Sequence, residues 1–102
     1  MKKILLVCNA GMSSSILINK IKQAAEGRNI EVKVEASSNN GINDEIGKWD
    51  VCLVGPQIKY AVDSIQVTLK IPVEAVEPRT YAMADGEAAL EQALRLYEKK
   101  DV

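Results

Sequence analysis

Two short runs of uninterrupted apolar residues constrain this chain more than any other feature. They are ILLV within Lys3 to Val7 and VCLV over Val51 to Val54. Each run is followed by small or turn-forming residues and has the length of a strand. A strand that is apolar throughout must be covered on both faces, as in parallel sheets flanked by helices. The two runs therefore predict two central strands of a covered parallel sheet.

Segments with the apolar period of a helix separate these strands or follow them. They are residues 13–27, 42–46, 61–69 and 85–100. Two further strands are expected, Ile30 to Ala36 and the short Pro72 to Val76. The first of these alternates apolar and charged residues, which fits a strand at the edge of a sheet. Strands and helices therefore alternate along the chain.

This alternation predicts an α/β fold, a three-layer sandwich in which a four-stranded parallel sheet has helices on both faces. The expected strand order is 2-1-3-4. In such open sheets the ligand binds beyond the carboxyl ends of the strands, where the strand order reverses. We therefore expect the site between the first and third strands, where the loops that follow Val7 and Val54 face each other.

Length, charge and residue content limit the functions open to the chain. Its 102 residues, 47% of them hydrophobic, suffice for a single domain over residues 1–102. Thirteen basic and fourteen acidic residues leave a net charge of −1, so the basic footprint of nucleic-acid binding is missing. No segment approaches the roughly 20 apolar residues that cross a bilayer, and we expect a soluble, cytoplasmic protein with reduced thiols. Histidine is absent, so any histidine that the chemistry needs must come from another protein.

A cysteine ends the first predicted strand, and a loop of small residues follows it in the segment VCNAGMSSS. Backbone N–H groups of such a loop, together with a helix N-terminus, can hold a phosphate without a cationic side chain. The same field stabilises a thiolate, which is the nucleophilic form of cysteine. We therefore expect Cys8 to attack phosphorus while the loop holds the oxygens. The candidate phosphate-binding residues are Asn9, Ala10, Gly11, Met12, Ser13, Ser14 and Ser15.

A structural interpretation of these residues stays open. Cys8 is also a small apolar residue that could complete a strand, and the serines could simply cap the helix. Cys52 is the internal comparison, because it lies inside VCLV with apolar neighbours and no polar loop. We expect Cys52 to be an inert buried thiol.

The segments CNAGMSSS and GPQIKY, residues 8–15 and 55–60, resemble the enzyme IIB component of the lactose/cellobiose class of the bacterial phosphoenolpyruvate-dependent sugar phosphotransferase system (PTS). The resemblance extends over essentially the whole chain, and the Gly-Pro-Gln loop is closer to cellobiose-type members. It implies a phosphotransferase in which a phosphohistidine of enzyme IIA gives its phosphoryl group to Cys8. Cys8 would pass the group to a β-glycoside disaccharide, such as cellobiose, chitobiose or lactose, that enters through the membrane component IIC. The resemblance implies no metal and no cofactor, and a monomer suits a protein that must dock with two partners.

Two other classes of protein remain open beside this one. Low-molecular-weight protein tyrosine phosphatases and arsenate reductases also carry a cysteine in a phosphate loop, which closes with an arginine six residues later. Here that position is Ser14, which favours a relay over hydrolysis. A flavodoxin-like domain would flank its flavin with aromatic side chains, whereas this chain has no Phe, one Trp and three Tyr.

Four more side chains are expected near the active end without an assigned role. They are Gln57, Tyr60, Arg79 and Tyr81, which lie on or near loops, as a docking rim or a site wall would. A structural or solvated role is preferred for each. Arg79 is the cation that could steady a phosphate or guide the acidic face of a partner.

Overall fold

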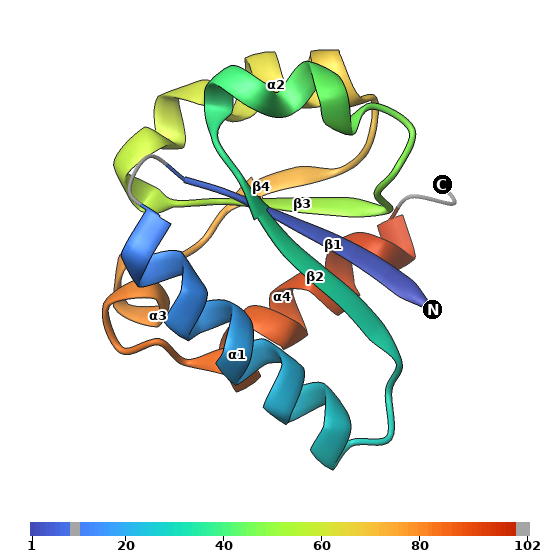
Figure 1. The fold of residues 1–102 in the computed structure, drawn as a ribbon, viewed down its shortest axis with the longest axis vertical. Coiled ribbons are helices and arrows are strands. Elements are labelled where there is room, and N and C mark those ends of the chain that lie inside the picture. The colour runs from blue at the N-terminus through green and yellow to red at the C-terminus, as the bar shows by residue number, and fades with distance from the viewer. Residues whose placement is uncertain (9–10, 100–102) are drawn as a thin grey trace.

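The protein is built on a four-stranded parallel sheet with the strand order β2-β1-β3-β4 (Figure 1). The computed structural model describes residues 1–8 and 11–99, and the side chains of residues 1–8 and 15–99. The strands are β1 (Lys2–Val7), β2 (Val32–Ser37), β3 (Val51–Val54) and β4 (Val73–Ala75). The order 2-1-3-4 and the parallel pairing confirm the prediction from the alternating pattern.

The described residues form four α-helices and two 3₁₀ helices around this sheet. They are α1 (Gly11–Gly27), η1 (Asn39–Glu45), η2 (Pro56–Ala61), α2 (Val62–Leu69), α3 (Pro78–Ala82) and α4 (Gly86–Lys99). The helices α1, α3 and α4 lie on one face of the sheet, and α2 lies on the other (Figure 1). The three-layer arrangement is therefore confirmed. None of the helices in the described part of the chain combines the length and apolarity that a membrane span needs.

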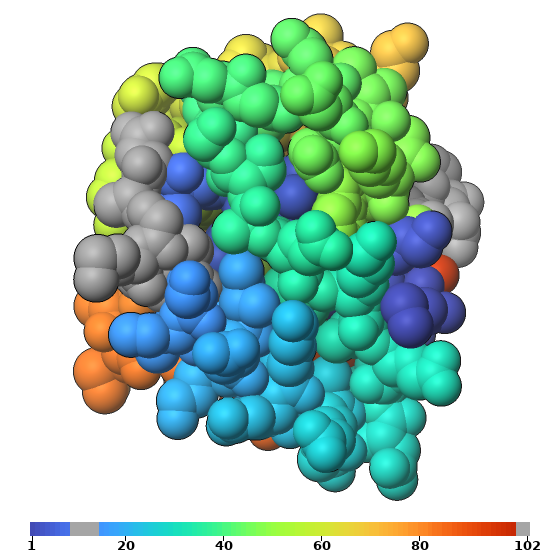
Figure 2. Space-filling view, in the orientation of Figure 1, coloured from blue at the N-terminus to red at the C-terminus, as the bar shows by residue number. Residues whose placement is uncertain are grey.

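The central position of β1 explains why its sequence is apolar without interruption. Successive side chains of a strand point to opposite faces, so Ile4 and Leu6 pack under α1 and α4, whereas Leu5 and Val7 pack under α2. All four are at most 1% exposed. In the space-filling view, the interior of β1 is visible only through small gaps between the residues that cover it (Figure 2). The strand at the sheet edge, β2, has the more exposed pattern that its alternation predicts.

The register of the central strands brings their carboxyl ends together. Val7 pairs with Val54, and the backbone N–H of Gly55 donates to the carbonyl of Val7 at an N···O distance of 2.8 Å. Since Cys8 and Gly55 each follow one of these paired residues, the two loops predicted to face each other do begin side by side.

The helix α3, like the 3₁₀ helix η2, was not predicted from the apolar periodicity. It has five residues, which is too short to show a helical repeat. It begins at Pro78, and proline favours the first position of a helix because its φ angle is already set and its missing N–H is not needed there. This short helix is important for the site because it carries Tyr81.

Several predicted boundaries differ from the structure by a few residues. The first helix begins at Gly11 and not at Ser13, so part of the predicted loop is the first turn of α1. The second strand begins at Val32 and not at Ile30. The helix predicted over residues 42–46 is the 3₁₀ helix η1 over Asn39–Glu45. These ends differ because capping and local turns, which leave weak sequence signals, decide where an element starts.

The helices α1 and α4 pack closely where α4 begins. A Cβ atom on Gly86 would lie 2.3 Å from both the carbonyl carbon and oxygen of Lys20, so the two helix backbones touch where only glycine fits. Nearby, Arg28 forms ion pairs with Glu87 and Glu91. Hydrogen bonds from Arg28 to the side chain of Glu91, and then to that of Glu87, raise the pKa of Arg28. These contacts join α1 and the residues after it to the start of α4.

Candidate functional site

Cys8 lies at the carboxyl end of β1, between the sheet and the start of α1. Its backbone N–H donates to the carbonyl of Ser37 at 3.2 Å, so Cys8 continues the pairing with β2 beyond the end of the strand. The helix α1 begins three residues later, at Gly11. The cysteine is 5% exposed, a burial that fits both a structural thiol and a sheltered nucleophile. The contacts of its side chain are therefore needed to distinguish a structural thiol from a nucleophile.

On one side, the end of β3 approaches Cys8 closely. A Cβ atom on Gly55 would lie 2.9 Å from the Cβ of Cys8 and 2.9 Å from Oε1 of Gln57. Any side chain at position 55 would push the cysteine or Gln57 aside. The glycine that ends the predicted third strand is thus required by the closeness of Cys8.

On the other side, Cys8 meets a tyrosine from α3. The hydroxyl of Tyr81 donates to Sγ of Cys8 at an O···S distance of 3.7 Å, which is long but within the range of hydrogen bonds to the larger sulfur atom. Tyr81 is 7% exposed, and its ring packs in the core between the sheet and α1. A polar group on a rigid side chain is therefore directed at the sulfur.

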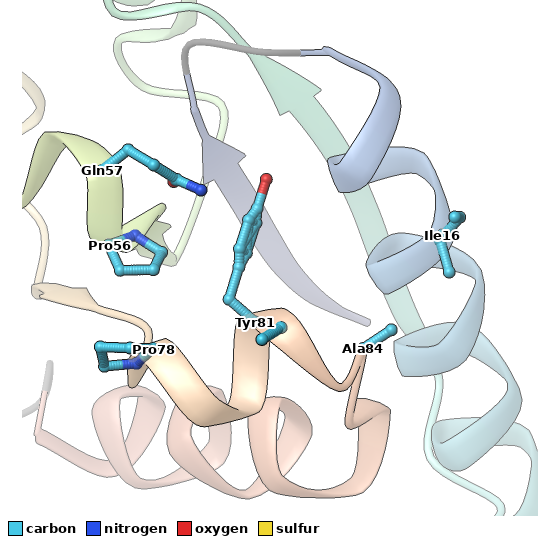
Figure 3. A pocket seen from close by; sticks show the side chains of 7 residues that line it. Ile16, Pro56, Gln57, Pro78, Tyr81 and Ala84 are labelled. Carbon is cyan, nitrogen blue, oxygen red and sulfur yellow. The ribbon is translucent and has the colours of Figure 1, made fainter.

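A pocket of about 540 Å³ opens beside these side chains. The residues that line it include Ile16, Pro56, Gln57, Pro78, Tyr81 and Ala84. They come from α1, from η2 and from the segment around α3, and most are apolar. Gln57 and Tyr81 supply the polar ends, which point toward the same space near the end of β1 (Figure 3). Tyr81 forms part of this wall and its hydroxyl donates to Sγ of Cys8, so the pocket adjoins the sulfur.

The predicted phosphate-binding residues fall at the start of α1. Asn9 and Ala10 lie outside the described residues. The first turn of α1 is formed by the backbone of Gly11, Met12, Ser13 and Ser14. Ser15 follows, with an exposed side chain. The first backbone N–H groups of a helix have no partner within the helix. Because this turn begins three residues after Cys8, it offers donors of the kind that bind phosphate.

The second cysteine lies in a different environment. Cys52 is fully buried inside β3 and packs among apolar side chains under α2. This burial raises the pKa of the Cys52 thiol from its ordinary value of 9.0 to about 12, because the charged form loses its hydration. Cys52 is therefore a neutral thiol at physiological pH, as predicted.

The four side chains expected near the active end separate into two pairs. Gln57 and Tyr81 line the pocket, so they form part of the site wall. Tyr60 is 80% exposed, and Arg79 is an exposed residue of α3.

The sequence did not predict the contacts of Gly55 and Tyr81 with Cys8. A signal for α3 was present in Glu77-Pro78, but no pattern indicates which residue of so short a helix points inward.

The groups around Cys8 suit an anion more than a cation. Within residues 1–8 and 11–99, no cluster of three or more His, Cys, Asp or Glu side chains could hold a metal ion. The donors of this region include the hydroxyl of Tyr81, which donates to the sulfur, the amide of Gln57 in the pocket wall, and the backbone N–H groups that begin α1 three residues after Cys8. All three are hydrogen-bond donors, as the oxygens of a phosphoryl group require.

Comparison with known proteins identifies the family. Residues 3–92 match the model of the family described as "PTS system, Lactose/Cellobiose specific IIB subunit". This chain belongs to that PTS IIB family. The match includes Cys8, the start of α1, the Gly55 turn and Tyr81.

Relatives of this PTS IIB chain cover it almost completely. The oligo-beta-mannoside-specific EIIB component of Bacillus subtilis (strain 168) is 38% identical over 99 residues, which are 94% of this chain and 96% of the relative. The cellobiose-specific EIIB component of Lactococcus lactis is 30% identical over 103 residues, with coverages of 93% and 95%. The solution structure of a cellobiose-specific IIB component from Borrelia burgdorferi has a TM-score of 0.80 and 31% identity, covering 97% of this chain and 94% of that one.

Membership of the PTS IIB family confirms the predicted activity. The protein is a phosphotransferase and a sugar-specific phosphoryl carrier of the phosphotransferase system. The phosphatase, arsenate reductase and flavodoxin-like alternatives are therefore set aside.

Proposed function

We propose that Cys8 is the residue that carries the phosphoryl group. Its Sγ attacks the phosphorus of a phosphohistidine on enzyme IIA, so that the S–P bond forms as the N–P bond breaks. The backbone N–H groups of residues 9–15 hold the phosphoryl oxygens during the transfer. The observation that carries this proposal is the position of Cys8, at the carboxyl edge of the sheet and directly before α1, beside a pocket with hydrogen-bond donors.

The chain's composition supports a donor on another protein. It contains no histidine, and family membership implies partners of the IIA and IIC types. In the second half of the relay, a hydroxyl oxygen of the sugar binds phosphorus as the S–P bond breaks, the thiolate leaves with the bonding electrons, and the hydroxyl proton passes to a base or to solvent. We infer that residues 1–102 act as one domain, as a monomer at the cytoplasmic side of the membrane, since the same site must meet two partners in turn.

The sugar is inferred from its chemical class. The relatives above are named for oligo-beta-mannosides and for cellobiose, which share a β-glycosidic bond. We therefore propose a β-linked disaccharide or short oligosaccharide as the acceptor, bound by the membrane component and not by this chain.

Intact-mass measurement tests the proposal. The protein is incubated with phosphoenolpyruvate, the general phosphotransferase proteins and a cognate IIA, and we expect one added phosphoryl group. Cys8→Ser should not take up the group, whereas the matched variant Cys52→Ser should. Uptake by Cys8→Ser, or loss of uptake in Cys52→Ser alone, would contradict the assignment.

A second assay distinguishes a carrier from a hydrolase. A chromogenic aryl phosphate should be cleaved slowly, because Ser14 stands where phosphatases have the arginine that clamps the phosphoryl oxygens. Rapid turnover of this substrate would instead indicate a phosphatase.

A further inference from the structure

A contact between the cysteine and a distant part of the chain is made by Tyr81. Its hydroxyl reaches Sγ of Cys8 at 3.7 Å across 73 residues of sequence. Nothing in the carrier function requires a tyrosine at this point in the fold, because the phosphoryl oxygens are held by backbone groups. The hydroxyl therefore needs an explanation of its own.

The surroundings of Tyr81 hold its hydroxyl in place. The backbone N–H of Tyr81 donates to the carbonyl of Glu77 at 3.0 Å, within a helix whose start is set by Pro78. The ring is buried in the core that α1 and α4 share with the sheet. A tyrosine ring has only two rotatable side-chain bonds, and packing fixes both here. The hydroxyl therefore remains near the sulfur without further loss of conformational freedom.

The sulfur is also confined from the opposite side. A Cβ at position 55 would lie 2.9 Å from the Cβ of Cys8, so the Gly55 backbone is the neighbour of the cysteine on the β3 side. On the other side, the Tyr81 hydroxyl donates to Sγ, and this directed contact orients the sulfur. Fixed placement of a nucleophile is a large part of what a phosphoryl-transfer site contributes.

The hydrogen bond from Tyr81 favours one charge state of the sulfur over the other. A phenolic O–H is a donor, and a thiolate accepts a hydrogen bond more strongly than a neutral thiol does because the acceptor is ionised. The bond should therefore favour the charged sulfur that attacks phosphorus. It should also stabilise the negative charge that returns to sulfur when the S–P bond breaks.

From these contacts we propose that Tyr81 is a positioning residue of the phosphoryl relay. Its hydroxyl orients Sγ of Cys8 and stabilises the thiolate both as nucleophile and as leaving group. The role in the relay rests on Cys8 being the carrier, as proposed above, whereas the effect of the hydroxyl on the sulfur does not. The two claims can therefore be tested separately.

The test compares Tyr81→Phe with Tyr60→Phe. Phenylalanine keeps the buried ring and removes only the hydroxyl, and Tyr60 is the matched control because its side chain is 80% exposed. Both cysteines are labelled with ¹³C at Cβ, and the chemical shift is followed as a function of pH. The Cys52 signal reports whether each variant is folded, since burial keeps this thiol protonated until about pH 12.

In Tyr81→Phe, we expect the titration midpoint of the Cys8 signal to rise by roughly half a pH unit to one unit, the equivalent of one ordinary hydrogen bond. Tyr60→Phe should leave the midpoint unchanged. A ring that serves packing alone would leave it unchanged in Tyr81→Phe too, and an unchanged or lowered midpoint overturns the proposal.

Phosphorylation by IIA supplies the second measurement. Tyr81→Phe should take up the phosphoryl group roughly two- to tenfold more slowly than the unmodified protein, with Tyr60→Phe as control. If the unmodified protein takes up no phosphoryl group on Cys8, the proposed function fails, while the titration still decides the effect of the Tyr81 hydroxyl on the sulfur. An unchanged uptake rate in Tyr81→Phe would overturn the positioning role.

Discussion

At the scale of single residues, the two cysteines show that burial alone does not assign a role. Both Cys8 and Cys52 are buried. Cys52 lies in the middle of β3 among apolar side chains, whereas Cys8 lies one residue past the end of β1 beside a hydroxyl, a glycine backbone and a helix start. The difference follows from position along the strand, and that position could be read from the sequence.

The buried thiol of Cys52 should make the free energy of unfolding decrease at alkaline pH. Its pKa is raised from 9.0 to about 12 by burial. Below about pH 9 the thiol is protonated in both folded and unfolded chains, and it has no effect. Above that pH the unfolded chain loses the proton first, so stability falls until about pH 12.

We therefore expect the free energy of unfolding to fall between about pH 8 and about pH 10 by roughly 1 kcal/mol more in the unmodified protein than in Cys52→Ala. Urea titrations at the two pH values measure this difference, and the comparison removes the contributions of tyrosine and lysine. An equal fall in the free energy of unfolding in both proteins would show that the Cys52 thiol is not shielded from water.

Gly55 is expected to control the position of the nucleophile. In Gly55→Ala the new Cβ meets the Cβ of Cys8 at 2.9 Å, so the cysteine must shift. Since small misplacements of reacting groups are costly, the rate of phosphoryl uptake should fall about tenfold or more. Gly41→Ala is the control, because its Cβ would make only ordinary contacts at 3.5 Å and 3.6 Å. Equal uptake rates in the two variants would contradict this role.

At the scale of elements, the sequence predicted the parts of the fold with long or uninterrupted apolar patterns. Val51–Val54 is found as predicted, because a strand covered on both faces needs apolar residues at every position. The helix α3 was missed because five residues cannot show a repeat. The turn after it was hidden as well, since Ala84 has a positive φ of 49°, a conformation that alanine rarely adopts.

The candidate site was predictable to the same extent. Cys8 and the start of α1 were found because a strand end followed by small residues is a local pattern. Gln57 and Tyr81 were expected near the active end without a role, but their shared pocket and the contact of Tyr81 with Cys8 arise only in the tertiary fold. Long-range contacts of this kind leave no signal in residue spacing.

The junction of α1 and α4 should depend on Gly86. A Cβ at this position would lie 2.3 Å from the backbone of Lys20, and the two helices would have to separate. We expect Gly86→Ala to lower the free energy of unfolding by about 1–3 kcal/mol or more, the usual range for overpacking. The variant Gly27→Ala should be neutral or slightly stabilising, because nothing lies within 4 Å of its Cβ. Urea denaturation measures both, and equal midpoints would refute the close contact.

At the scale of the whole molecule, the charges nearly balance, with a net charge of −1. Association with a partner therefore depends on where individual charges lie and not on an overall field. Arg79 is an exposed cation on α3, the helix that also carries Tyr81.

We expect Arg79→Ala to slow phosphoryl uptake from IIA mildly at low salt, and the difference to shrink as salt screens the charge. The matched control is Arg95→Ala, which removes an exposed cation from α4. Rates measured by rapid quench at several ionic strengths test this. No change in the rate at low salt would remove Arg79 from the mechanism.

The distance in sequence between Cys8 and Tyr81 also has a consequence for the newly made protein. The cysteine is synthesised early, and the tyrosine that contacts its sulfur follows 73 residues later. At a synthesis rate of about 5–20 residues per second, the interval is about 4 to 15 seconds. During that time the thiol is present without its hydroxyl neighbour, so the carrier site is completed only when nearly the whole chain described here has been translated.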